Sequence, residues 1–417
     1  LTDKNVPFAE EDKRSPIIAA LSLDLSDKLK QLKLIPRDYQ ERIVNIACAE
    51  KKGIVRAATG SGKTLVAALI TAQLNKPTTI YVIGLDLLKQ FHDLFSSLFD
   101  EPIGFIGNGV CQIERINIAS VWTIGSALRL NKKTILSDDE DDNSEDELDE
   151  KHSVKIVRML QNTNVHLFDE SHVITTNTIK EIFKTIDPEY IYGLSGTPFR
   201  DDNSDLLIHG ILGEKIVDVS ASELIAKGVL VQPTIKFVSV PPMSRAGTQY
   251  QSVYKNYIVE NNIRNSLIVE QVKMLLDKKY TPLVLFKQIK HGKILSEMMD
   301  DAGIKHEMLY GNDSLVKRTK VKESLVNREI DVLLASVIYD MGIDIPMLNA
   351  LVLCGGGKST IRSLQRIGRV IRSYPGKKFA AVIDFYDQVR FLKLHSLTRR
   401  KTYQSEPGFK VVDCKWG

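Results

Sequence analysis

The chain has 417 residues, of which 43% are hydrophobic and 26% charged, a composition typical of globular proteins, and its length predicts two or three domains. Four widely spaced cysteines without a Cys-x-x-Cys pair argue against a zinc site or a disulfide framework and suit a reducing cytoplasm. No apolar stretch is long enough to span a membrane, and we expect no signal peptide in the polar opening segment. The chain begins with Leu1 rather than Met, so the sequence leaves open whether an N-terminal piece precedes it.

The net charge of +4 hides a strong asymmetry. Residues 138–150 contain ten Asp or Glu and no Lys or Arg, whereas residues 358–401 contain twelve Lys or Arg and two Asp. We interpret residues 137–151 as a disordered acidic insertion, with a nucleic-acid mimic that occupies a basic groove as the alternative. The basic remainder favours a polyanionic partner.

Strand-length apolar runs alternate with helical patterns along the chain. In the first half they lie at residues 79–83, 116–120, 165–168 and 190–194. After Pro241 and Pro242 the pattern restarts, at residues 283–286, 307–310, 332–335, 350–353 and 379–383. This alternation predicts α/β folding with two mostly parallel sheets flanked by helices. We expect an N-terminal segment (1–30), a first domain (31–232) and a second domain (233–417).

A phosphate-binding loop is predicted after the apolar pair Ile54 and Val55. The segment 57–64 reads Ala-Ala-Thr-Gly-Ser-Gly-Lys-Thr, with Ala57 in the place of the usual first glycine. Gly60 and Gly62 allow the backbone to approach phosphates closely, beside Thr59 and Ser61. Lys63 is expected on the β- and γ-phosphates of ATP, and the Thr64 hydroxyl on Mg²⁺.

An acidic pair follows the buried run 165–168. Asp169 is expected to hold Mg²⁺, and Glu170 to orient and deprotonate the attacking water. His172 is a candidate relay between the hydrolytic site and the nucleic-acid site, against the alternative of a structural histidine. Together with the phosphate loop, these residues predict hydrolysis of a nucleoside triphosphate.

The segment 365–372, Gln-Arg-Ile-Gly-Arg-Val-Ile-Arg, matches a QRxGRxxR motif. With the Asp-Glu-Ser-His segment 169–172 and Ser195-Gly196-Thr197, the chain resembles the DExH members of helicase superfamily 2. The resemblance extends from about residue 35 to the C-terminus. Residues 285–287 and 291–293 also resemble the phage UvsW-type branch-migration helicases. Gly84-Leu85 and Ser336 depart from the usual strand-contact motifs.

The resemblance implies two RecA-like domains with the nucleotide between them, and it extends the set of expected site residues. Arg369 and Arg372 lie three apart on one helix face and are expected to act as arginine fingers from the second domain. The resemblance adds Arg37, Gln40, Gly342, Asp344 and Gln365 as nucleotide-binding residues. It adds Ser195 and Thr197, with His172, as coupling residues. Residues 82–91 and 119–123 correspond to segments that touch the backbone of one nucleic-acid strand in the family.

The expected activity is therefore that of an ATP-dependent DNA helicase or translocase that remodels branched DNA, with ATP and Mg²⁺ as cofactors. The resemblance suggests 3′→5′ movement and, for a phage enzyme, action in the host cytoplasm. An RNA helicase and a motor subunit of a restriction or repair complex remain alternatives. Two further segments resemble functional motifs only weakly. The glycine-rich segment 355–359, with Asp384, resembles a second nucleotide site, and Asp413-Cys414-Lys415 has the spacing of a nuclease motif; we expect neither to be functional.

Overall fold

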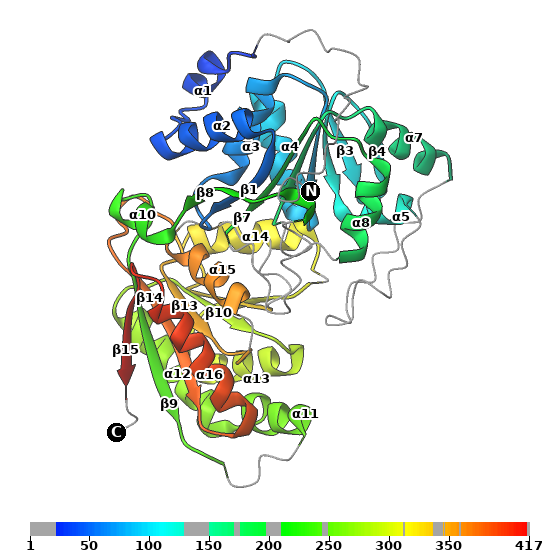
Figure 1. Ribbon diagram of the computed structural model, residues 1–417. Helices are drawn as coiled ribbons and strands as arrows, with labels where there is room; N and C mark the ends of the chain where they lie inside the picture. Colours follow the sequence, from blue (N-terminus) through cyan, green and yellow to red (C-terminus); the bar gives the residue numbers. More distant parts are fainter. Residues whose placement is uncertain are drawn as a thin grey trace, which may run out of the picture.

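The computed structural model describes residues 22–128, 150–170, 176–196, 210–243, 249–311, 313–336, 345, 347–357 and 360–414. These residues form two sheets, one above the other in Figure 1, each flanked by helices. The first sheet has the strand order β4-β3-β5-β2-β6-β7-β1-β8, and the second has the order β11-β12-β10-β13-β14-β9-β15. The predicted α/β class is confirmed.

The first sheet is parallel except for the pairing of β4 with β3. Its strands are β1 (Lys52–Ala57), β2 (Thr78–Val82), β3 (Ile103–Gly107), β4 (Val110–Gln112), β5 (Ile116–Ser120), β6 (Val165–Asp169), β7 (Tyr190–Ser195) and β8 (Lys215–Val219).

Alternating side chains place the first sheet between two apolar layers. Val55 and Ile80 pack into one cluster, with α2 (Asp38–Glu50), α3 (Lys63–Leu74) and α4 (Leu85–Leu98). Ile54 and Tyr81 pack into another, with α5 (Val121–Ala127), α7 (Glu150–Gln161) and α8 (Thr176–Thr185). Strands buried on both faces read as continuous apolar runs, which explains why the sequence reveals them.

The second sheet is parallel in every described pairing. Its strands are β9 (Pro233–Val240), β10 (Pro282–Phe286), β11 (His306–Leu309), β12 (Val332–Ser336), β13 (Ala350–Leu353), β14 (Ala380–Asp387) and β15 (Lys410–Cys414). On the face toward the first domain lie α14 (Leu315–Val326) and α15 (Thr360–Val370). The opposite face carries α12 (Asn262–Asp277), α13 (Ile289–Asp301) and the π-helix η2 (Tyr254–Val259). The remaining helices are α1 (Ser26–Gln31), α10 (Ala221–Ala226), α11 (Tyr250–Val253) and α16 (Arg390–Gln404).

The connection between the sheets is itself tied to the second domain. Leu230 pairs with Arg372 in an antiparallel bridge, and the Val231 amide donates to the Ile371 carbonyl at 2.7 Å. The segment that links the domains therefore also holds the chain that follows α15.

The acidic insertion has an earlier end than the sequence predicts. Glu150 begins α7, so residues 150 and 151 are helical rather than part of the insertion. The apolar face of α7, with Ile156 and Leu160 buried, packs on the first domain and stabilises the helix, so the helix includes residues 150 and 151. The rest of the acidic run lies outside the described residues. Within the described part of the chain, every helix is too short or too polar to cross a bilayer.

Candidate nucleotide-binding site

The phosphate loop connects β1 to α3, as the sequence predicts. Gly60 and Gly62 have φ values of +90° and +80°, which favour glycine. A Cβ atom on Gly62 would lie 2.5 Å from Gln40 Nε2, so a side chain there would displace that amide. Lys63 and Thr64 open α3, and a helix N-terminus of this kind attracts phosphate.

Tyr39 and Gln40, at the start of α2, hold the backbone of this loop by hydrogen bonds. The Tyr39 hydroxyl and Gln40 Nε2 both donate to the Ser61 carbonyl, at 2.8 and 2.9 Å. Gln40 Oε1 accepts from the Arg37 amide at 3.0 Å, which caps α2. The contacts of Gln40 are thus with the loop backbone, while Arg37 lies exposed beside it. Tyr39 lies between the two predicted residues Arg37 and Gln40, and no motif in the sequence predicts its contact with the loop.

The acidic pair stands at the end of β6. Asp169 is 4% exposed, and its Oδ1 atom has no hydrogen-bond partner among the described residues. Burial, with a smaller contribution from the negative charge of Glu170, raises the pKa of Asp169 to about 7, against the opposing effect of Lys63. Glu170 adopts a left-handed backbone conformation (φ +48°), which turns the chain out of the sheet immediately after Asp169.

Asp169 and Thr64 fit a Mg²⁺ ion that arrives with a nucleotide. Mg²⁺ is usually held by one or two carboxylates together with substrate phosphates and water, rather than by a cage of protein ligands. Accordingly, the described residues include no cluster of three or more His, Cys, Asp or Glu side chains that could hold a metal. The buried Asp169 oxygen without a partner is the feature that such an ion would satisfy.

Glu170 is surrounded by contacts from three different elements. Lys63 Nζ lies 3.3 Å from Oε1. Ser195 Oγ, at the end of β7, donates to Oε2 at 3.4 Å. Gln365 Nε2, on α15 of the second domain, donates to the same Oε2 at 3.2 Å. The carboxylate predicted to activate water therefore lies where the two domains meet.

Helix α15, which carries Arg369, lies against the phosphate loop. A Cβ atom on Gly368 would lie 2.4 Å from Thr59 Cβ, so only glycine allows this close approach. A Cβ atom on Gly60 would lie 3.3 Å from Arg372 Cγ. The Nε atoms of Arg369 and Arg372 are both buried. The prediction that Arg369 and Arg372 share one helix face is wrong, because α15 ends at Val370 and Arg372 lies beyond it in the bridge to Leu230. Arg372 nevertheless lies beside the phosphate loop, and Arg369 lies on the helix that contacts Thr59 of that loop.

Several predicted site residues cannot be placed. His172, Thr197, Gly342 and Asp344 lie outside the described residues. Their assignments stay predictions.

The second glycine-rich segment is filled by protein side chains. Arg399 donates to both Asp384 oxygens, at 2.9 and 2.8 Å, and to the Gly357 carbonyl at 2.6 Å. The Tyr403 hydroxyl also donates to Asp384, at 3.1 Å. A carboxylate bound in this way has no oxygen directed to a metal, which argues against a second nucleotide site. The nuclease-like Asp413 lies on β15 and pairs with Arg400.

A phosphate loop and an acidic pair at the end of one sheet, contacted by a helix of a second sheet, define a two-domain nucleotide-binding protein. The comparisons with known sequences agree. Residues 33–200 match the family "Type III restriction enzyme, res subunit", and residues 264–374 match "Helicase conserved C-terminal domain". The chain belongs to the superfamily 2 helicases.

Individual relatives are distant. A helicase of a Sulfolobus islandicus filamentous virus is 27% identical over 82% of this chain and 62% of its own length. The ATP-dependent DNA helicase uvsW of phage T4 is 28% identical over 56% of this chain and 48% of its own length. The DNA 3′-5′ translocase XPB2 of Sulfurisphaera tokodaii is 23% identical over 81% of this chain and 78% of its own length. The chain thus spans only about half to two thirds of the first two relatives.

Solved structures show the same fold. A fragment of an HsdR subunit of a type I restriction enzyme from Vibrio vulnificus YJ016 covers 91% of this chain and 69% of its own, with a TM-score of 0.63 and 17% identity. S. cerevisiae Dbp5 bound to RNA and ADP BeF3 covers 95% of this chain and 94% of its own, with a TM-score of 0.65 and 13% identity.

Proposed function

We propose that the chain is an ATP-driven DNA translocase that remodels branched DNA, by moving forks or four-way junctions. The motor function is supported by the contacts of Glu170 at the domain interface. Lys63 and Ser195 of the first domain and Gln365 of the second domain all contact its carboxylate. A hydrolytic base shared by two domains links the chemistry to the position of the domains.

The protein residues have separate tasks in this proposal. The backbone of residues 59–62 and the Lys63 ammonium bind the phosphates of ATP, and Thr64 with Asp169 would hold Mg²⁺, which neutralises phosphate charge. Glu170 orients a water molecule and accepts its proton. Arg369 and Arg372 stabilise the charge that develops on the transferred phosphoryl group. Hydrolysis removes the group that bridges the domains, so they separate and regrip the nucleic acid.

DNA is the favoured track because relatives named as DNA helicases or translocases cover much of the chain, and because the chain outside its acidic run is basic. Contacts to phosphates carry no base information, so no sequence preference is expected. Branch migration re-forms one base pair for each pair broken, whereas opening a duplex costs about 1.4 kcal/mol per base-pair step. A two-domain motor therefore needs only to supply direction, for which the XPB2 relative supports 3′→5′. Two viral relatives support action in the cytoplasm of an infected cell.

The test is ATPase stimulation by a matched panel of single-stranded, duplex, forked and four-way DNA, repeated with RNA. We expect the strongest stimulation by forks and junctions, with their conversion to migrated products, and none for Lys63→Ala. Efficient opening of plain tailed duplexes without movement of forks or junctions would refute the branched substrate. Stronger stimulation by RNA than by DNA would favour an RNA helicase.

A motor subunit of a restriction complex is the second candidate. It is favoured by the match of residues 33–200 to the restriction-subunit family. In that case, movement on DNA would appear only after addition of partner subunits, whereas the primary proposal expects it from the chain alone.

A further inference from the structure

The first domain has a cavity at the amino-terminal ends of its strands, on the side of the sheet opposite the nucleotide site. Its volume is about 460 Å³, within the range of ligand-binding pockets. Pro77 precedes β2, Arg115 precedes β5 and Thr163 precedes β6, so the cavity opens at the amino ends of these strands. The nucleotide groups lie at the carboxyl ends, and both sites can therefore be filled together.

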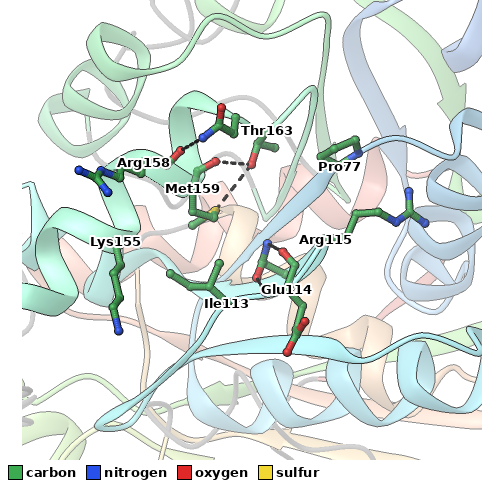
Figure 2. Close-up of a pocket in the computed structure, with 10 residues that line it drawn as sticks. Pro77, Ile113, Glu114, Arg115, Lys155, Arg158, Met159 and Thr163 are labelled. Atoms are coloured by element: carbon green, nitrogen blue, oxygen red, sulfur yellow. Dashed lines mark hydrogen bonds between the residues drawn. The ribbon is translucent and has the colours of Figure 1, made fainter. Parts of the chain in front are cut away.

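Part of the cavity wall is apolar. Ile113, Met159 and Pro77 line it, as Figure 2 shows. The polar groups between them already have partners within the protein. Asn117 exchanges two hydrogen bonds with the Glu114 backbone, at 2.8 and 2.7 Å. The Thr163 hydroxyl donates to the Met159 carbonyl at 2.9 Å.

These partnered walls favour an apolar group over a nucleobase. A base held by its edge needs donors and acceptors that remain available, and their desolvation would otherwise cost free energy. A large aliphatic or aromatic side chain needs only van der Waals contact, which Ile113, Met159 and Pro77 provide.

The charged residues that line the cavity are three cations, Arg115, Lys155 and Arg158, and one carboxylate, Glu114. Lys155 and Arg158 lie three residues apart on α7, and neither forms an ion pair with a carboxylate within the described part of the chain. Arg115, by contrast, is fixed by Glu101, to which its Nε donates at 2.7 Å. Two cations beside an apolar hollow complement carboxylates that flank an apolar side chain.

We propose that this cavity docks an acidic peptide segment of a partner protein, with one aromatic or large aliphatic side chain inserted between Ile113 and Met159. The carboxylates of the segment pair with Lys155 and Arg158. Because the cavity faces away from the nucleotide seam, docking recruits the motor without blocking ATP.

The experiment is selection of a random-peptide display library on the full chain. We expect enrichment of sequences with a Phe, Trp, Leu or Ile flanked by Asp or Glu. A fluorescein-labelled copy of an enriched peptide should bind Lys155→Glu and Arg158→Glu at least tenfold more weakly than the unaltered chain. Ile113→Ser should weaken binding similarly, whereas Lys180→Glu, an exposed cation on α8, should not. DNA-stimulated ATPase should be unchanged in all four variants. Thermal unfolding should be unchanged in the three charge variants, whereas Ile113→Ser should unfold at a somewhat lower temperature because Ile113 packs against the core.

Three outcomes would overturn the proposal. The first is failure to enrich acidic, apolar peptides, or binding that is indifferent to the cavity variants. The second is peptide binding that appears only after deletion of residues 138–149, since the acidic run of the chain would then be the occupant. The third is displacement of the peptide by single-stranded oligonucleotide with the same dependence on Arg158, which would make the cavity a nucleic-acid contact.

Discussion

Gln365 of the second domain donates a hydrogen bond of 3.2 Å to Glu170 Oε2 of the first domain. The same carboxylate contacts Lys63 and Ser195 from its own domain. The orientation of the proposed general base therefore depends on closure of the cleft. Sequence reasoning gave Gln365 a nucleotide-binding role, and the observed contact adds positioning of Glu170.

Replacement of Gln365 by Ala should lower kcat for ATP hydrolysis by about 10-fold to 100-fold, because a poorly oriented base loses part of its effect. The affinity for ATP, measured with a fluorescent analogue, should change by less than about twofold, since the phosphate-loop contacts remain. Gln365→Glu should be worse than Ala because it sets two carboxylates against each other. An unchanged kcat in Gln365→Ala would show that the contact does not serve hydrolysis.

Arg369→Lys and Arg372→Lys should each lower kcat by roughly 10³-fold or more, within the range for arginine fingers. Lysine keeps the charge but loses the planar fork that contacts two oxygens together. Binding of ATP by the first domain should persist in both. The matched control is Arg400→Lys on α16, where Arg400 pairs with Asp413, and its kcat should stay within about twofold. Equal loss in the control would indicate a general effect on the second domain.

The sequence predicts many of the buried parallel strands, because β2, β5, β6, β10, β12 and β13 are short apolar runs on their own. It misses β4, β8 and β15, which lie at sheet edges and keep exposed residues. It also misses β3, which carries two glycines, and β9, in which apolar and polar residues are mixed. Local pattern cannot reveal them, since their pairing partners are supplied by the rest of the fold.

The site shows the same division. Short motifs identify Lys63, Asp169 and Glu170 because the chemistry fixes residue type and spacing. The contact of Gly368 with Thr59 and the occupation of Asp384 by Arg399 join residues far apart in the chain. No local spacing encodes such contacts.

An ion pair across the cleft should help to keep the domains closed. Arg318 Nη1 on α14 donates to Asp86 Oδ2, in the first turn of α4, at 2.6 Å. Both side chains are partly exposed, so the pair is expected to contribute roughly 1 kcal/mol or less. Asp86→Asn should therefore reduce the closed population by up to about fivefold, in inter-domain fluorescence transfer without nucleotide.

The control for this pair is Asp93→Asn, an exposed carboxylate on the same helix. Arg318→Gln should match Asp86→Asn, and the double variant should be no more open than either single variant. Additive effects of the two single variants would show that these side chains act independently.

Asp169→Asn should abolish hydrolysis yet stabilise the nucleotide-free protein above neutral pH. The folded-state pKa of about 7 lies above the ordinary value of 3.8. The wild type therefore loses stability progressively between these two values as pH rises, because the unfolded chain is already ionised there while the folded protein must give up its proton. Asparagine does not ionise. In chelator-containing buffer, the gain in free energy of unfolding should be roughly 2 kcal/mol larger at pH 8 than at pH 5, because the penalty in the wild type grows with each pH unit up to about 7. A gain that is equal at both pH values would assign it to packing instead of charge.

The buried pair of Arg399 and Asp384 should stabilise the second domain strongly, because its members are 3% and 0% exposed in their side chains. Arg399→Met leaves Asp384 charged and buried, with Tyr403 as its remaining side-chain partner among the contacts seen. The expected loss is about 3–5 kcal/mol in urea unfolding of the second domain.

The double variant Arg399→Met, Asp384→Leu should recover most of that stability, since an apolar pair of similar volume removes the buried charge. Its ATP-binding stoichiometry should remain one per chain, because the phosphate loop of the first domain is intact. If the double variant instead bound a second ATP, the glycine-rich segment 355–357 would be a nucleotide site that Arg399 normally closes. If the single variant unfolded like the wild type, the ion pair would serve position rather than stability.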